Sequence, residues 1–238
     1  MDLARFLDVS TAMAASAARP NFGNVHRERR KLPERPLELY EFELCPYCRI
    51  AREALSALSL DPIVYPCPKG GRLFREKVKR EGGRYQFPYL VDSNTGISMY
   101  ESADIVDYLF REYGDGRAPW FLKRRSFAVT TSMLASAFRP GRGRYAVASR
   151  QPEALLELYS YEGSPFCRIA REALCELELP YRLHNVPRRS PDRQRYVSIS
   201  GKMQVPYLLD PNTGAQMFES AEIRRYLYDN YALAQATG

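Results

Sequence analysis

The sequence predicts an α/β fold with two tandem βαβαββα domains, joined by a linker that contains a helix. Residues 37–58 align without gaps to residues 156–177, and 15 of these 22 positions are identical. A second block, residues 87–109, matches residues 205–227 at 14 of 23 positions. The chain has 238 residues, enough for two domains of about 100 residues that each bury a core.

The elements of the first domain follow from local patterns. Alternating or continuously apolar runs predict strands, and the turn Asn94-Thr95-Gly96 joins the last two as a hairpin. Apolar residues on one helical face predict helices, the last of which stops at Gly114. The predicted strands are residues 37–42, 62–65, 89–92 and 97–100. The predicted helices are residues 49–58, 72–80 and 102–113.

These patterns divide the chain into four segments. Residues 1–36 show no sustained period, so we expect a disordered tail; their Ala, Ser and Arg content also fits the remnant of a targeting segment. Residues 37–116 form the first domain, and residues 153–238 form the second. The linker, residues 117–152, contains a predicted bridging helix over residues 127–138, followed by a basic turn.

The composition excludes several classes of protein. No apolar run is long enough to predict a membrane-spanning helix. Five cysteines are too few for a disulfide-stapled secreted scaffold and favour a reducing compartment. The net charge of +7 comes from residues 1–36 and from the linker, which carries eight basic and no acidic side chains. Two nearly neutral domains joined by a basic linker argue against nucleic-acid binding.

The motif Cys45-Pro46-Tyr47-Cys48 lies between the first predicted strand and the first predicted helix. Backbone N–H groups and the dipole at a helix N-terminus favour the thiolate of Cys45, which is the nucleophilic form. Cys48, one turn later, can attack a mixed disulfide and release the product. A zinc site would need two more ligands with paired spacing, which the chain does not show, so no metal is expected.

Together with Phe87-Pro88 and Glu101-Ser102, this motif resembles the glutaredoxins and the N-terminal domain of glutathione transferases, which share the thioredoxin fold. The layout is similar to tandem plastid proteins of plants and algae with two thioredoxin-like domains. The resemblance covers residues 37–113 and 154–231. It implies glutathione as co-substrate, a chloroplast location (or else a cytoplasmic one), and cis peptide bonds before both repeated prolines. It also implies that glutathione contacts these residues: Phe87, Pro88, Glu101, Ser102, Val205, Pro206, Glu219 and Ser220.

The chain departs from the family pattern at several positions. Glutaredoxins commonly carry a lysine just before the active cysteine, where this chain has Glu43 and Leu44, and the charge of Glu43 is expected to weaken activity. The large helical C-terminal domain of transferases has no counterpart. In the second domain Ser164 replaces the first cysteine, which leaves a degenerate Ser-Pro-Phe-Cys copy with Cys167 as a core thiol. Cys67 is a candidate accessory thiol or a buried filler.

Two functions compete on this basis. The first is a glutathione-dependent thiol–disulfide oxidoreductase, with Cys45 as nucleophile, Cys48 as resolving thiol, and protein thiols or disulfides as partners. The second is a glutathione-binding or protein-interaction scaffold without catalysis, favoured by Glu43, Ser164 and the missing helical domain. A third alternative is ligation of an iron–sulfur cluster by Cys45 and glutathione.

Overall fold

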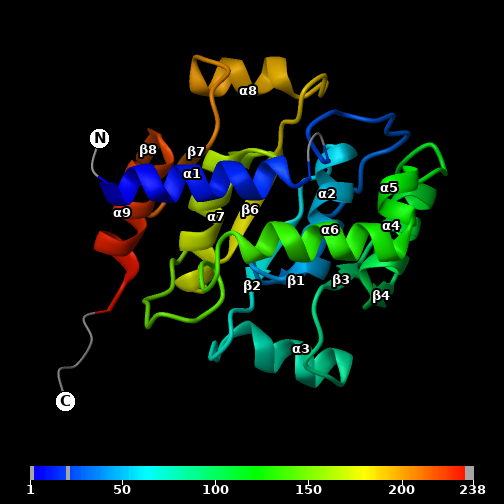
Figure 1. Ribbon diagram of the computed structural model, residues 1–238, viewed down its shortest axis with the longest axis horizontal. Helices are drawn as coiled ribbons and strands as arrows, with labels where there is room; N and C mark the ends of the chain where they lie inside the picture. Colours follow the sequence, from blue (N-terminus) through cyan, green and yellow to red (C-terminus); the bar gives the residue numbers. More distant parts are fainter. Residues whose placement is uncertain (1–2, 20–21, 234–238) are drawn as a thin grey trace.

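A computed structural model describes residues 3–19 and 22–233 and shows two α/β domains that share one sheet. The strand order is β4-β3-β1-β2-β6-β5-β7-β8, so four strands of each domain lie side by side (Figure 1). The tandem α/β architecture is therefore confirmed. No helix in these two ranges is long and apolar enough to cross a membrane.

The first domain follows the predicted order, with shifts of a few residues at element ends. Its first helix begins at Pro46, three residues earlier than predicted, because Cys45 caps the helix and proline suits its first turn. The strands are β1 (Glu38–Glu41), β2 (Ile63–Pro66), β3 (Tyr89–Asp92) and β4 (Ile97–Met99). The helices are α2 (Pro46–Ala57), α3 (Phe74–Gly82) and α4 (Ser102–Glu112).

The second domain repeats this arrangement. Leu156, Leu158 and Leu208 line its core, and Leu37, Leu39 and Leu90 occupy the corresponding places in the first domain. The strands are β5 (Leu156–Ser160), β6 (Tyr181–Asn185), β7 (Tyr207–Asp210) and β8 (Ala215–Phe218). The helices are α7 (Pro165–Glu176), α8 (Arg193–Ser200) and α9 (Ser220–Tyr231).

The two domains meet at the centre of the sheet. Strands β2 and β6 pair in antiparallel register, with Ile63 opposite Arg182 and Val64 opposite Tyr181. Val64 packs into the core of the second domain. The pairing covers two edge strands that would otherwise expose unpaired backbone groups.

The prediction of a disordered tail is wrong for residues 3–19 and 22–36, whereas residues 1–2 and 20–21 lie outside the described part of the chain. Residues Leu3–Ala17 form helix α1, which packs on α7, whereas α6 (Arg125–Ala137) packs on α2. The linker also contains the short helix α5 (Trp120–Lys123). Each long helix therefore covers one domain, and α1 and α6 lie side by side in front of the sheet (Figure 1). Tertiary packing stabilises α1, so the helix can form without a strong local periodicity in its sequence.

The repeat is consequently longer than the two domains alone. Thr11, Met13 and Arg19 of α1 and its following turn recur as Thr131, Met133 and Arg139, 120 positions later. The turns after the two helices cross between the domains: Val25 forms a β-bridge with Arg188, and Tyr145 forms one with Lys69. The chain thus consists of two copies of a helix, a crossing turn and an α/β domain.

Repeated glycines allow these crossing turns to approach the domains closely. Gly23 and Gly143 both have positive φ, +69° and +61°. A Cβ atom on Gly143 would lie 2.7 Å from the Cβ of Glu43, which is closer than packing allows. The basic turn of the linker is therefore part of the packed structure rather than a solvated connection, and Arg139 within it is buried.

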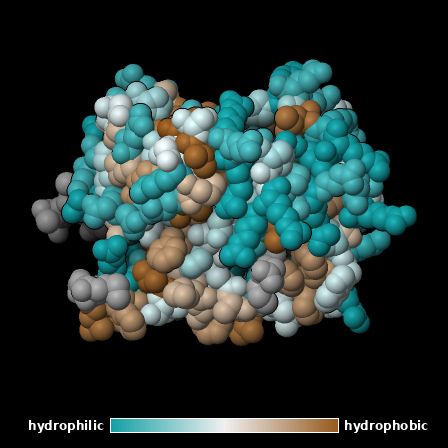
Figure 2. All heavy atoms as spheres, turned by 90° about the horizontal axis from the view of Figure 1, so that it is seen from above, coloured by the Kyte–Doolittle hydropathy of each residue, from teal (hydrophilic) through white to brown (hydrophobic). Residues whose placement is uncertain are grey.

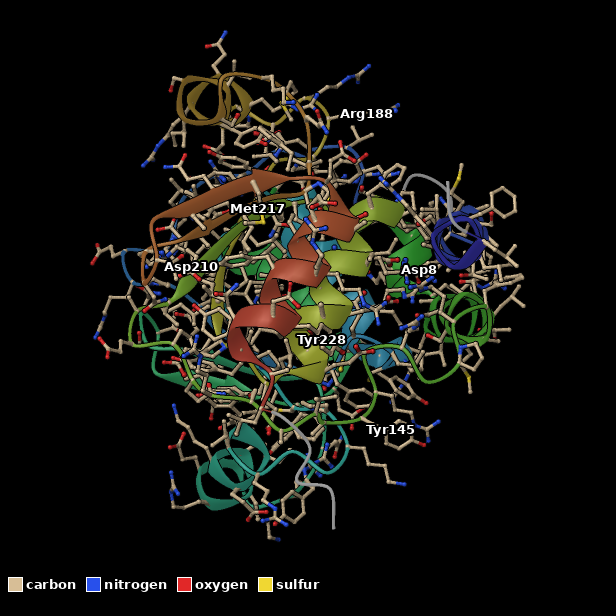
Figure 3. All side chains as sticks on the ribbon, turned by 90° about the vertical axis from the view of Figure 1, so that its left-hand side faces the viewer. Asp8, Tyr145, Arg188, Asp210, Met217 and Tyr228 are labelled. Carbon is tan, nitrogen blue, oxygen red and sulfur yellow. The ribbon has the colours of Figure 1, made fainter. Side chains whose placement is uncertain are left out.

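Hydrophobic side chains remain exposed on α1 and α6. Seen from above in Figure 2, the face with α8 is mostly hydrophilic, and hydrophobic residues gather along the lower edge, where α1 and α6 lie. Asp8 lies on the inner side of α1 (Figure 3). It pairs with Arg139 and Arg224. The exposed apolar residues of the two helices are Leu3, Phe6, Leu7, Met13, Met133 and Leu134.

Candidate functional site

Cys45 lies at the N-terminus of α2, as the sequence predicts. It is the residue that caps the helix, and its Sγ accepts a hydrogen bond from the backbone N–H of Cys48 at 3.2 Å. A donor of this kind stabilises a thiolate more than a thiol. Only 4% of Cys45 is exposed, and Ser132 of α6 donates a hydrogen bond to the carbonyl of the adjacent Pro46 at 2.7 Å. The nucleophile candidate therefore lies just beneath the surface, next to α6.

Cys48 is fully buried one turn further into α2. Burial, together with its interaction with Cys45, raises the pKa of the Cys48 thiol well above its ordinary value. Cys48 is thus a protonated thiol at neutral pH. As a resolving thiol it would need local opening of the first turn of α2.

The predicted bend at Phe87-Pro88 lies against the cysteine. The peptide bond is cis, as the resemblance implies, and the carbonyl oxygen of Phe87 is 4.0 Å from the Sγ of Cys45. The guanidinium of Arg75 lies over the Phe87 ring, 4.8 Å from its centroid. The site therefore combines a thiol that caps a helix, a cis-proline turn and the guanidinium of Arg75.

Glu101 and Ser102 form the start of α4. Glu101 has a positive φ of 66°, a conformation that costs energy for a residue with a side chain. Its carboxylate accepts hydrogen bonds from the amide of Gln86 at 2.5 Å and from Arg125 of α6 at 3.0 Å. Since Gln86 precedes Phe87, this contact ties the acidic end of the candidate site to the segment that touches Cys45.

The second domain reproduces the geometry without the thiol. Ser164 caps α7 and accepts a hydrogen bond from the N–H of Cys167 at 3.3 Å. Val205-Pro206 is also cis. Ser220 begins α9, next to Glu219, which has φ 66°. Glu219 accepts a hydrogen bond from the amide of Gln204 at 2.6 Å and pairs with Arg5 of α1 at 3.8 Å. The second copy has serine in place of cysteine at position 164 but keeps the helix cap and the cis-proline turn of the first.

Sequence reasoning missed Gln86, Arg125, Gln204 and Arg5. The signal that could have found them is the repeat itself, because glutamine precedes both motifs and arginine occupies equivalent positions of α1 and α6. The helix that completes each site comes from outside the domain that holds the cysteine or serine. No pattern within a single domain therefore points to Arg125 or Arg5.

The effect on activity that we expect from the charge of Glu43 stays a prediction, and the structure shows this charge paired in the interior. Glu43 is buried at the seam between the domains, where Arg171 donates hydrogen bonds to both carboxylate oxygens at 3.1 Å. Its charge is matched by a cation across the seam. Glu43, two residues before Cys45, therefore stabilises the junction of the two domains.

The remaining cysteines lie in the interior. Cys167 and Cys175 are buried, which confirms their interpretation as core thiols. Cys67 is also fully buried, and burial raises the pKa of its thiol well above the ordinary value. A role for Cys67 as an accessory thiol stays a prediction, and the burial of its side chain does not favour that role. Within residues 3–19 and 22–233, no group of three or more His, Cys, Asp or Glu side chains is arranged to hold a metal ion.

Both domains are similar to proteins of a known family. The family model described as glutathione S-transferase, N-terminal domain, matches residues 39–118 and 158–235. A glutathione S-transferase-like protein, tpcF, from Aspergillus fumigatus is 36% identical over 58 residues. That match covers 24% of this chain and 26% of the relative, so it spans about a quarter of the fungal protein.

A trimeric glutathione transferase of Leishmania, TDR1, is similar at 16% identity with a TM-score of 0.31. The match covers 86% of this chain and 70% of that one.

The family model matches about two thirds of the chain, in two separate segments that coincide with the two domains. The chain therefore belongs to the family of glutathione S-transferase N-terminal domains.

Proposed function

We propose that the protein is a glutathione-dependent thiol–disulfide oxidoreductase that uses Cys45 of the first domain. The observation that carries the proposal is the position of the Cys45 Sγ atom. It accepts a hydrogen bond from the backbone N–H of Cys48 and lies 4.0 Å from the carbonyl oxygen of Phe87. Glu101 and the N-terminus of α4 supply groups for the ammonium and carboxylate of a γ-glutamyl moiety. Glutathione is the expected co-substrate.

The chemistry proceeds by two thiol–disulfide exchanges. The Cys45 thiolate attacks a disulfide between glutathione and a substrate thiol, the S–S bond breaks, and the substrate leaves as a thiolate that takes up a proton. The enzyme then carries glutathione on Cys45. A second glutathione thiolate attacks this mixed disulfide, which regenerates Cys45 and forms glutathione disulfide. The first glutathione enters already oxidised in the mixed disulfide, so the net reaction converts that disulfide and one glutathione thiol into the substrate thiol and glutathione disulfide.

Cys48 can replace the second glutathione in a dithiol route. Its attack on the mixed disulfide would break the bond between Cys45 and glutathione, release glutathione as a thiolate and form a Cys45–Cys48 disulfide, which external thiols then reduce. The complete burial of Cys48 and its raised pKa make this route slower than attack by glutathione. We therefore propose Cys48 as a resolving thiol that acts only after the first turn of α2 opens.

A second candidate function is a glutathione-binding or protein-interaction scaffold without catalysis. The observation that favours it is the 4% exposure of Cys45 beside α6. The second domain keeps this geometry with Ser164 in place of a thiol.

The chloroplast location stays a prediction. The Ala-rich composition that also fits a targeting segment has a second explanation in the packing of α1 on α7.

A reciprocal exchange of the two capping residues tests the proposal. The assay follows reduction of a glutathione mixed disulfide, coupled to glutathione reductase, for the wild type, Cys45→Ser and Ser164→Cys. We expect Cys45→Ser to abolish activity and Ser164→Cys to add activity to the second site. Equal rates for the wild type and Cys45→Ser would overturn the oxidoreductase proposal.

Alkylation separates the scaffold from the enzyme. Iodoacetamide labelling of the native protein, mapped by mass spectrometry, should modify Cys45 faster than the buried Cys67, which is the matched internal control. Labelling of Cys45 as slow as that of Cys67, with retained glutathione binding, would favour the scaffold.

A further inference from the structure

A cavity lies between the central strands and α8, away from both candidate sites. Its volume is about 140 Å³, close to that of a cavity that holds one benzene ring. Asp61 of the first domain and His184 of the second both line it, so both domains contribute to its wall. Figure 1 shows α8 standing above the sheet, on the side opposite α3. The other lining residues include Tyr159, Tyr196, Arg182, Arg195 and Asp192.

One wall of this cavity is a fixed stack of planar groups. The His184 ring stacks on Tyr159 with centroids 4.4 Å apart and planes 16° apart, and Tyr159 stacks in turn on Tyr196 at 4.8 Å. The two ring nitrogens of His184 lie 3.0 Å from Asp61 and 3.0 Å from Glu157. The imidazole is therefore held in place from both sides and presents a rigid, planar surface.

The charges around the cavity are unevenly matched. Asp61 contacts His184 and accepts a hydrogen bond from the N–H of Asn185 at 2.8 Å, and Asp192 pairs with Arg29 at 3.2 Å. Within the described ranges, the guanidinium groups of Arg182 and Arg195 have neither an ion-pair nor a hydrogen-bond partner. The cavity thus offers two free cations beside a wall of planar rings.

The first domain shows what this position looks like without a cavity. Lys77, the counterpart of Arg195, lies 5.2 Å from the Tyr40 ring and 5.1 Å from the Tyr65 ring, and pairs with Glu38 at 3.6 Å. In the second domain His184 replaces Tyr65, and it engages Glu157, the counterpart of Glu38. Because Glu157 binds His184, it does not pair with Arg195 in the way that Glu38 pairs with Lys77.

We infer that this cavity binds a small aromatic carboxylate. The ring would pack in the cavity against the His184–Tyr159 stack, and the carboxylate would accept hydrogen bonds from Arg182 and Arg195. A volume near that of one ring limits the ligand to a single aromatic ring with a short acidic substituent. This site is independent of the thiol chemistry proposed for Cys45.

Ligand-observed NMR titration of the full chain tests the inference with benzoate, its neutral isostere benzamide, and inorganic phosphate. We expect benzoate to bind at least about tenfold more tightly than benzamide, since a charge-assisted contact is lost. Arg182→Gln and Arg195→Gln should each weaken benzoate binding about tenfold. Lys77→Gln, at the equivalent place in the first domain, is the matched control and should change nothing.

Arg195 is exposed, so we expect its replacement to leave the fold intact, and circular dichroism of each variant checks this. Equal binding of benzoate and benzamide would overturn the inference, as would unchanged benzoate binding in Arg195→Gln. Phosphate binding as tight as that of benzoate would overturn recognition of the ring. The test does not involve Cys45, so a failed redox assay leaves it unaffected.

Discussion

Arg52 in α2 of the first domain forms a buried ion pair with Glu162 of the second, with Nε 2.9 Å from Oε2. Across the same seam Arg171 pairs with Glu43 at 3.1 Å, so the repeat produces the contact twice in opposite directions. All four side chains are at most 3% exposed. The two domains are thus joined by matched charges in addition to the β2–β6 pairing.

Loss of Arg52 should destabilise the whole molecule. Arg52→Gln leaves Glu41 buried without this cation, whereas Glu162 keeps its ion pair with Arg171 at 2.9 Å. An uncompensated buried charge costs about 3–5 kcal/mol. Urea unfolding followed by circular dichroism measures the change. Arg225→Gln is the matched control, because Arg225 pairs with Glu222 on the exposed face of α9 and should cost less than about 1 kcal/mol. Similar losses in the two variants would contradict this account of the seam.

Glu41 should make the protein less stable as the pH rises towards neutrality. Burial raises the pKa of Glu41 to about 7, against the opposing effect of Arg52. The folded state therefore binds this proton more tightly than the unfolded state, and the stabilisation is complete below about pH 4.5 and lost as the pH rises through about 7. Glu41→Gln should remove that loss, on the order of 1–3 kcal/mol.

The measurement is the free energy of unfolding at several pH values between about 4.5 and 8. Glu162 provides a contrast of opposite sign: burial opposes its ionisation, but Arg171 and Arg52 lower the pKa of Glu162 to about 2. Its stabilising charge is therefore present above about pH 4.5 and is lost only as the pH falls through about 2. A wild type and a Glu41→Gln variant with parallel pH profiles would contradict the role given to Glu41.

Glu101 should control glutathione affinity in the first domain. Gln86 and Arg125 hold its carboxylate, and removal of one charge-assisted contact weakens binding about tenfold. Calorimetric titration with glutathione should show this for Glu101→Gln, with Glu219→Gln as background so that only the first site is measured. Asp107→Asn, an exposed change on the same helix, should leave the affinity unchanged. Equal affinities for Glu101→Gln and Asp107→Asn would remove Glu101 from the site.

The sequence predicts each domain well because its elements have strong local signals and occur twice. The cap at Cys45, the two prolines and the hairpin at Asn94-Thr95-Gly96 are short-range features, and the structure has them where expected. The seam could not be predicted in this way. Arg52 and Arg171 occupy identical positions on helices that look amphipathic, and only the pairing of β2 with β6 brings each to the other domain.

The candidate site shows the same division. The residues on one continuous stretch, from Cys45 to Cys48, were predictable, whereas Arg125 and Arg5 come from helices outside the domains that they serve. Helix α1 was missed because its stability depends on α7 and on buried contacts such as Arg19 with Glu53, where Nε lies 2.6 Å from Oε1. Tertiary contacts decide both, and no local pattern encodes them.

Deletion of residues 1–19 therefore tests the most consequential difference between sequence and structure. The deletion would expose the face of α7 that α1 covers and leave Glu53 buried without the guanidinium of Arg19. We expect a loss of at least about 3 kcal/mol, with cleavage in the second domain under limited proteolysis. Arg19→Met alone should reproduce the electrostatic part of the loss but leave the second domain protected. If these residues were a dispensable tail, the shortened chain would unfold at the same urea concentration as the full chain.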